Sequence, residues 1–438
     1  MKPIARASFP ATKFCLAIAA AAVWIAASHW RIEAAESAGD SNVRWWKGNL
    51  HTHSFWSDGD QFPEMVVAWY KDHDYNFLAL SDHNRMLEGE RWLTVSTNRG
   101  AAEALKKYEK EWGTNWVQVR SHGTNQQVRL KTLEDFRGKL EVPGKFLLIP
   151  GEEITDNYQS IPIHLNASNL RELIPPQGGQ SIFEVIQNDI KAVLDQRQRT
   201  GQPMIPHVNH PNFGWALTAE DMERVQGEKF FEVFNGHPIV HNNGADSHAS
   251  VERIWDILLT RRLAELNLDV IWGTAVDDAH NYHQYNSTVS NPGRGWIMVR
   301  SANLDPASLL AAMEAGDFYA SSGVKLKEIR RSKTGLYIEI DAEPGVNYTT
   351  IFIGTRKGYD AHSEPVKKDG KELRVTRRYS KDVGATLAEI IGTSASYQLK
   401  GDEIYVRARI ESSKASRSPT SDNPYERAWV QPLVTGVK

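Results

Sequence analysis

Two histidines stand two positions apart in Gly48-Asn-Leu-His51-Thr-His53, and Asp58 follows five residues after the second. The preceding residues 43–50 predict a strand. Successive side chains of a strand point to opposite faces, so His51 and His53 share one face. Two imidazoles on one face can hold a single ion, and imidazole with carboxylate suits zinc, manganese or iron. The pattern therefore indicates a metal site.

Three further clusters of histidine and carboxylate follow at domain-scale spacing. They are Ser81-Asp-His83-Asn84, His207-Val-Asn-His210-Pro211 and Asp277-Asp278-Ala-His280. A single cluster of this kind is often a surface or core histidine held by ordinary hydrogen bonds. Four in one chain favour metal ligation over that interpretation.

Short apolar runs alternate with amphipathic segments between residues 45 and 325. This alternation predicts an α/β fold with a parallel sheet and crossover helices, often closed as a barrel. Three of the histidine clusters lie at or after the C-terminal ends of predicted strands, the rim where barrel enzymes build their sites. Strands are predicted at 77–80, 146–149, 161–165, 204–208, 230–234, 270–272 and 296–299, and helices from Pro63 and at 181–199, 250–266 and 306–315.

Two stretches depart from this alternation. Residues 85–142 hold a polar helix candidate and a glutamine-rich loop, which we interpret as an insertion over the rim. After Gly323, alternating and β-branched segments separated by Gly, Pro and Ser turns predict a small antiparallel β domain. We therefore divide the chain into a leader (1–38), an α/β domain (43–325) and a C-terminal β-rich domain (326–438).

The leader has the character of a secretory signal. Three basic residues precede an uncharged run, 14–27, that is short for a bilayer span but fits the apolar core of a signal peptide. Small residues at 34–38 predict cleavage there, with 26–28 as a second candidate and an uncleaved anchor as the alternative. We expect a bacterial periplasmic or secreted protein without a stable membrane span after cleavage.

Composition narrows the chemistry further. The only cysteine of the 438 residues, Cys15, lies in the leader, so the mature chain would hold metal through nitrogen and oxygen alone. The net charge of -3 is spread without long blocks of one sign, which argues against nucleic acid as the main partner.

The motifs recur in a fixed order along residues 45–325: His51-x-His53 with Asp58-Gly59, Asp82-His83-Asn84, Gly151-Glu-Glu153-Ile-Thr155, His164, His210-Pro211 and Asp278-Ala-His280. This set resembles the PHP (polymerase and histidinol phosphatase) metallohydrolases. Asn209-His-Pro-Asn212, Asn235-Gly-His237-Pro238 and Arg294-Gly-Trp296 resemble its secreted, carbaryl-hydrolase-like (CehA/McbA-like) branch. The resemblance implies a distorted seven-stranded β/α barrel with two or three divalent ions at its C-terminal rim.

The resemblance also implies a ligand set. One ion would be held by His51, His53, Glu153 and Asp278, a second by Glu153, His164 and His210, and a third by Asp58, His83 and His280. Glu153, Asp278 and His210 are preferred to Glu152, Asp277 and His207 because they complete the family's Gly-x-Glu, Asp-x-His and His-Pro patterns. The spare residues either orient the ligands or fill space.

Two such ions about 4 Å apart would lower the pKa of a bridging water and bind the substrate oxygen. No Gly-x-Ser-x-Gly motif is present and no mature cysteine, so we expect attack by hydroxide. Candidate general acids are His280, His237 and Asp82. Arg294 would either clamp an anionic substrate bidentately or form a structural salt bridge.

The leading prediction is a secreted metal-dependent hydrolase acting on a small-molecule phosphoester. The alternative is the same site acting on a carbamate, carboxylic ester or amide, and a third is a non-catalytic binding protein stabilised by metal. The full ligand set and the open rim favour an enzyme over the third. The sequence leaves open the physiological substrate, the metal and the oligomeric state.

Overall fold

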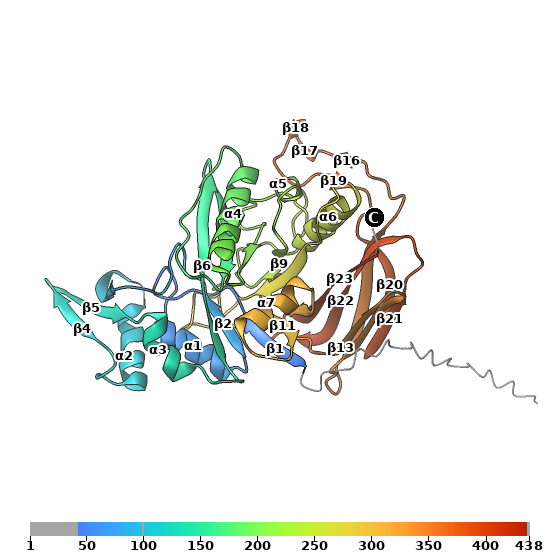
Figure 1. The fold of residues 1–438 in the computed structure, drawn as a ribbon. Coiled ribbons are helices and arrows are strands. Elements are labelled where there is room, and N and C mark those ends of the chain that lie inside the picture. The colour runs from blue at the N-terminus through green and yellow to red at the C-terminus, as the bar shows by residue number, and fades with distance from the viewer. Residues whose placement is uncertain (1–42, 99, 436–438) are drawn as a thin grey trace, which may run out of the picture. The chain divides into compact units, whose positions relative to one another are not determined.

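The computed structural model describes residues 43–98 and 100–435. The predicted leader lies outside the described residues. The described chain has a mixed α/β fold with one thirteen-stranded sheet and four small sheets (Figure 1). None of the described helices combines the length and apolar character that a bilayer crossing needs.

Nine strands of the first three-quarters of the chain belong to the large sheet. They are β1 (Arg44–Asn49), β2 (Phe77–Leu80), β6 (Leu147–Tyr158), β7 (Ile161–Ser168), β8 (Ile205–Val208), β9 (Phe230–Asn235), β10 (Trp272–Val276), β11 (Trp296–Ser301) and β12 (Phe318–Ser321). Their spatial order is β10-β9-β8-β7-β6-β2-β1-β11-β12. All eight strands predicted between residues 43 and 325 are present, although the one predicted at 270–272 begins only at Trp272.

Their directions correct the prediction of a parallel sheet. β1, β2 and β6 run parallel, as do β8, β9 and β10, but β7 is antiparallel to both of its neighbours. The reason is local. β6 continues for twelve residues and turns through Gln159 and Ser160, both with positive φ, directly into β7. A two-residue turn of this kind makes a hairpin, and a parallel crossover would need a much longer connection.

The predicted helices are confirmed as α1 (Pro63–Asp72), α4 (Ile182–Thr200), α6 (Val251–Ala264) and α7 (Pro306–Glu314). Their ends follow local chemistry. α1 has proline in its first turn, and Ser181 caps α4 by accepting a hydrogen bond from the backbone N–H of Glu184. α4 packs against β6, β7 and β8 and so supports the strands that carry three of the nine predicted ligands. A four-residue helix, α5 (Ala219–Met222), precedes β9.

The predicted insertion folds as a unit with its own sheet, in the order β3-β5-β4. Its apolar residues, among them Leu93, Leu105 and Val128, pack in one cluster with α1. Its elements are β3 (Arg91–Thr94), η1 (Val95–Thr97), α2 (Ala101–Trp112), β4 (Val119–His122), β5 (Asn125–Leu130) and α3 (Leu133–Leu140).

The C-terminal region is antiparallel β, and its strands extend the large sheet. β12 pairs with β23 (Tyr425–Val434), which is followed in the sheet by β22 (Glu403–Ala415), β15 (Tyr348–Arg356) and β20 (Ala385–Ile391). A second sheet is formed by β13 (Leu326–Ser332), β14 (Gly335–Ile340) and β21 (Ser394–Gln398). Two short pairs complete the region: β16 (Ser363–Glu364) with β19 (Arg378–Tyr379), and β17 (Lys367–Lys368) with β18 (Lys371–Glu372).

The core does not stop at residue 325. Ile404, Tyr405 and Trp429 of the C-terminal strands share one buried cluster with Trp255 and Leu258 of α6. The C-terminal strands therefore pack against the α/β region through a continuous sheet and a common apolar core.

Candidate metal centre

The structure brings all nine predicted metal ligands together. They reach one place because strand ends and the β6–β7 hairpin converge there. His51 and His53 follow β1, Asp58 lies in the next loop, and His83 follows β2. Glu153 and His164 lie within β6 and β7, His210 follows β8, and Asp278 and His280 follow β10. Their ligand atoms form overlapping groups in which all atoms lie within 4.8 Å of one another.

Glu153 lies at the centre of this arrangement. Its Oε2 is 3.3 Å from the Nε2 atoms of both His51 and His53 and 3.0 Å from Nδ1 of His83. Its Oε1 is 3.1 Å from Nδ1 of His164 and 3.4 Å from Nε2 of His210. One carboxylate thus faces five imidazoles, the position that a bridging ligand requires.

The electrostatics of Glu153 follow from these neighbours. Burial acts to raise its pKa, but the surrounding histidines, His83 and His51 first, hold it well below its ordinary value. His83 shows the reverse effect, because burial acts to lower its pKa while Glu153 and Asp58 raise it to about 11. The cluster therefore stabilises an ionised carboxylate beside positive charge.

The other two carboxylates complete the group. Oδ1 of Asp278 is 3.3 Å from Nε2 of His51 and 3.2 Å from Nε2 of His53. Asp278 has a φ of 49°, a left-handed conformation that costs energy in a residue other than glycine and is typical of functional sites.

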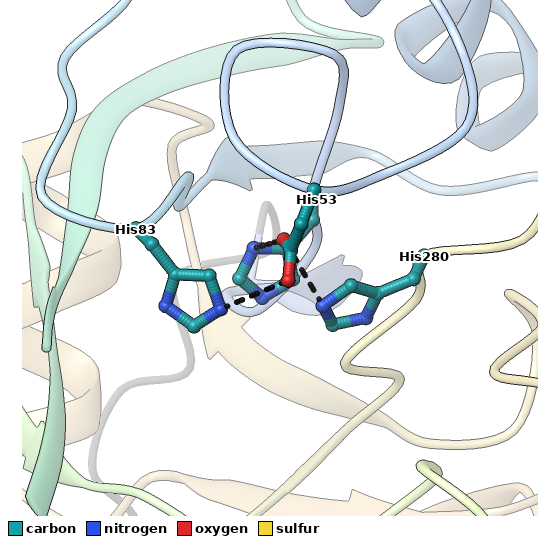
Figure 2. A group of neighbouring side chains, drawn as sticks. His53, His83 and His280 are labelled. Carbon is teal, nitrogen blue, oxygen red and sulfur yellow. Dashed lines mark ion pairs between the residues drawn. The ribbon is translucent and has the colours of Figure 1, made fainter. Parts of the chain in front are cut away.

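Asp58 serves the outer part of the cluster. Its carboxylate oxygens are 3.5 Å from Nε2 of His83 and 3.3 Å from Nε2 of His280. Figure 2 shows His53, His83 and His280 arranged around these ion pairs. Asp58 is half exposed, so this side of the cluster faces solvent.

The buried polar atoms test whether the site fits metal. Nε2 of His51, Nε2 of His53 and Oε2 of Glu153 are buried and have no hydrogen-bond partner in the described chain. Buried polar atoms are nearly always paired, because leaving one unpaired costs about 1–3 kcal/mol. Three unpaired lone-pair donors aimed at one point satisfy the requirement of a divalent cation that prefers nitrogen and oxygen.

The register choices within the motifs are visible in the structure. Glu152, next to Glu153 in β6, is fully buried away from the cluster and accepts a hydrogen bond from the backbone N–H of Ile174 at 2.6 Å. Asp277 accepts hydrogen bonds from the backbone N–H groups of Arg294 and Gly295 and from Asn49 and Tyr70. Asp277 therefore supports the loops beneath the site, and Glu152 faces the other side of the strand.

Three of the four predicted catalytic residues lie outside the ligand groups. Asp82 is fully buried, and its carboxylate accepts hydrogen bonds from the backbone N–H and hydroxyl groups of both Ser54 and Ser57. It holds the loop that carries Asp58. The guanidinium of Arg294 donates to the carbonyl oxygens of Gly236 and Asn286, at 2.9 and 2.8 Å.

His237 lies beside the cluster, with its ring 5.5 Å from that of His280. Burial lowers its pKa to about 4, with the neighbouring carboxylate of Asp278 acting in the opposite direction. Its Nδ1 accepts a hydrogen bond from the backbone N–H of Ile239 at 3.3 Å, so the neutral ring carries its proton on Nε2. His280, the fourth predicted catalytic residue, is within the ligand groups.

Sequence reasoning missed Glu232. This residue of β9 is fully buried, with Oε1 2.6 Å from Nδ1 of His51 and 3.3 Å from Nε2 of His207. Burial acts to raise its pKa, but the histidines, His51 above all, lower it to about 2. The available signal was a single carboxylate inside the apolar run Phe230-Phe-Glu-Val-Phe234.

Comparison with known proteins finds only distant structural neighbours. No family model matches the chain, and no curated protein matches it. One similar solved structure is a two-domain protein from Bacteroides vulgatus described as containing a predicted PHP-like metal-dependent phosphoesterase, with 13% identity and a TM-score of 0.36 over 90% of this chain and 96% of that one. Another, from Bifidobacterium adolescentis, has been assigned as a metal-dependent phosphoesterase. It shares 13% identity and a TM-score of 0.27 over 56% of this chain and 92% of that one. Identities and TM-scores this low support no inference about activity, so the function is argued below from the side chains of this protein.

Proposed function

We propose that this protein is a metal-dependent hydrolase of PHP type that cleaves a phosphoester. The observation that carries the proposal is the position of Glu153, whose two oxygens face five histidines while buried lone pairs around it lack partners. A carboxylate so placed can hold two cations a few ångströms apart by screening their mutual repulsion. The motif order in the sequence supports the same class.

The described side chains supply enough ligands for two or three ions. His51, His53 and Asp278 form one compact group, and His53, Asp58, His83 and His280 form another. Glu153 lies in one group with His51 and His210 and in a further group with His83 and His164. Zinc, manganese and iron all accept this set of nitrogen and oxygen donors. When bound, divalent ions in such a site lower the pKa of coordinated water and neutralise charge on the substrate.

Protein groups around the ligands are arranged for proton handling. Nδ1 of His280 lies 3.0 Å from the carbonyl oxygen of Asp278, so its proton sits there and its Nε2 lone pair faces Asp58. Neutral His237 presents Nε2–H beside it. We assign His237 as the hydrogen-bond donor to the leaving group. Asp82 and Arg294 take positioning roles, because their polar atoms are already engaged with loop residues.

One observation supports the alternative that the substrate is a carboxylic ester or a carbamate. Within the described residues, the carboxylates of Asp58, Glu153 and Asp278 form ion pairs only with histidines, and the guanidinium of Arg294 donates to backbone carbonyls. A dianionic phosphate monoester usually meets arginine or lysine. The arrangement favours a phosphodiester first and a neutral ester or carbamate second.

We also propose that β1, β2 and β6–β10 form the seven-stranded barrel of this class. An isolated parallel bridge between Thr52, after β1, and Ala279, after β10, supports closure of the two ends. The further proposal of export rests on the sequence of residues 1–38 alone.

The experiment is a substrate panel on metal-loaded protein. Bis-p-nitrophenyl phosphate, p-nitrophenyl phosphate, naphthyl acetate and a naphthyl carbamate are compared after reconstitution with zinc, manganese or iron, with elemental analysis of the same samples. We expect at least two ions per chain and the highest turnover on the diester. Turnover confined to the acetate or carbamate would overturn the phosphoesterase proposal, and bound metal without turnover of any substrate would favour a binding protein.

A further inference from the structure

Glu232, which belongs to none of the sequence motifs, contacts several residues of the candidate metal centre. Its Oε1 lies 2.6 Å from Nδ1 of His51 and 3.3 Å from Nε2 of His207. Its Oε2 accepts the backbone N–H of His210 and the side-chain amide of Asn235, both at 2.8 Å. The same amide nitrogen of Asn235 donates to Asp278 at 3.1 Å. Glu232 is therefore linked to three residues of the proposed ligand set.

The hydrogen-bonding groups of these partners determine which side chain can occupy position 232. The backbone N–H of His210 and the amide N–H of Asn235 can only donate, so both need an acceptor at Oε2. On the other oxygen, the 2.6 Å contact is short, as expected when a ring N–H donates to a charged carboxylate. Only a carboxylate offers acceptors at both positions. An amide of the same shape would place its NH2 group against donors on one side or the other.

This contact decides the tautomer of His51. With its proton on Nδ1 and directed to Glu232, the neutral ring must carry its lone pair on Nε2, which is the buried, unpartnered atom facing Glu153 and Asp278. A histidine that ligates metal commonly donates its other N–H to a carboxylate in this way.

We propose that Glu232 is a positioning residue of the metal centre, which fixes the Nδ1–H tautomer of His51 and the backbone at His210 without itself binding metal. The proposal rests on the proposed function only in requiring that the cluster bind metal. The competing assignment is that His51, His207 and Glu232, whose atoms also form a compact group, hold an additional inner ion. In that case Nδ1 of His51 would carry a lone pair and no proton.

The test compares Glu232→Gln and Glu232→Asp with Glu228→Gln. Glu228 is a matched control because it is also a buried glutamate of this region, and it accepts a hydrogen bond from the backbone N–H of Phe230. Metal affinity is measured by competition with a chelator, metal content by elemental analysis at saturation, and the His51 Nδ1 proton by NMR in diamagnetic, zinc-loaded protein. Circular dichroism establishes that each variant is folded.

We expect Glu232→Gln to weaken metal binding by about 10- to 100-fold, the range typical of removing a carboxylate that orients a metal-bound histidine. Saturated metal content should stay the same, and a strongly downfield His51 proton signal of the wild type should disappear. Glu232→Asp should keep part of the affinity, and Glu228→Gln should match the wild type.

Two results would overturn this role. If the affinity of Glu232→Gln and Glu232→Asp equals that of the wild type, Glu232 does not position the ligands. If both variants, and His207→Ala with them, lose one whole ion at saturation, the inner-ion assignment is correct. Neither readout uses turnover, so a protein that binds metal with the expected dependence on Glu232 but hydrolyses nothing would refute the proposed function and leave this inference standing.

Discussion

The metal centre and the joint between α6 and β22 both bury charged side chains, but the two sites differ in how these side chains are paired. In the α6–β22 joint, defined as Glu252, Asp256, Tyr405 and Arg407, Nε and Nη2 of Arg407 each donate to an oxygen of Asp256 at 2.7 Å. Tyr405 donates to Asp256 at 2.8 Å, and Nη1 of Arg407 donates to Glu252 at 3.2 Å. Every polar atom of Asp256 and Arg407 has a partner.

In the metal centre, by contrast, several buried polar atoms have no hydrogen-bond partner. His51 and His53 each keep one buried ring nitrogen without a partner, and so does one oxygen of Glu153. A buried cation that is fully paired within the chain joins two parts of the structure and leaves nothing for a ligand. Buried lone pairs that converge without a donor remain costly until something positive satisfies them. The difference separates an architectural cluster from a binding cluster without reference to any relative.

The largest expected effect comes from Glu153, the carboxylate at the centre of the unpaired histidine nitrogens. Glu153→Gln keeps the shape but removes the charge that lies between the proposed cations. We expect loss of the two ions proposed to share Glu153 and a fall in turnover of at least about a thousandfold, or about 4 kcal/mol. Elemental analysis and steady-state kinetics measure the two effects.

Glu152→Gln is the control for that variant, since the neighbouring carboxylate faces away from the cluster. It should retain both metal and turnover. If the two variants exchange phenotypes, the bridging role belongs to Glu152 and the register proposed for the Gly-Glu-Glu motif is wrong.

In the joint, Asp256→Ala should affect stability and not chemistry. Removing one partner leaves the buried guanidinium of Arg407 uncompensated, which costs about 3–5 kcal/mol. Denaturant titration measures the free energy of unfolding, and turnover per folded molecule should stay near that of the wild type.

A paired replacement sharpens this result. Asp256→Leu combined with Arg407→Met removes both charges, and we expect it to recover most of the lost stability because no unpaired ion remains. Metal loss from folded Asp256→Ala would show instead that the joint and the metal centre are coupled, and the distinction drawn between them would fail.

A smaller effect is expected at the exposed side of the metal centre. His83 contacts Asp58 and Glu153 and is about a quarter exposed. His83→Ala should lower turnover about 10- to 100-fold, equivalent to about 1.4–2.7 kcal/mol, and remove one ion at most. Metal content measured beside kcat checks this, and loss of every ion would make His83 as central as Glu153.

The smallest effect on metal content and turnover concerns Glu152, which has a buried oxygen without a partner and no ion pair with a histidine in the described chain. Burial raises its pKa to about 8, above the unfolded value of about 4.3, so folding favours the protonated form. That contribution to stability is fully present below about pH 4 and is lost as the pH rises through 8. Glu152→Gln should remove this slope, which amounts to about 1.4 kcal/mol per pH unit between the two pKa values, and should be the more stable protein at pH 9.

Denaturant titrations of the metal-free protein at several pH values measure the slope. A steeper slope in Glu152→Gln than in the wild type would mean that another buried acid governs this range. The expected result would show that a single buried oxygen without a partner lowers the stability of the fold. Several such atoms that converge form a metal-binding site instead.

The proposed ligands could be predicted from the sequence because metal binding demands particular residue types. His51 and His53, like Asp278 and His280, keep a two-residue spacing, and Glu153 and His210 stand in recognisable motifs. The helices were equally readable, since apolar periodicity and caps such as Ser181 are local properties. The C-terminal β character followed from alternation along single strands.

Glu232 could not be found in this way. A single carboxylate in an apolar strand has no motif, and its role exists only because β9 lies beside β8 and β10 and faces His51 across the sheet. The surroundings of Asp82 and Arg294 could not be predicted for a related reason. Their residue types suit catalysis, but their atoms are engaged by loops that are distant in sequence, such as Ser54 with Asp82 and Asn286 with Arg294.

Residue type and strand periodicity are local properties, so the side chains able to bind metal and the order of the strands that carry them could be predicted along the chain. The turn of β7 back on β6, the continuation of the sheet past residue 325 and the surroundings of each buried carboxylate appear only in the folded protein. These features depend on strand neighbours and on competition for hydrogen-bond partners. Both are set by contacts between residues far apart in the chain, where no local pattern reaches.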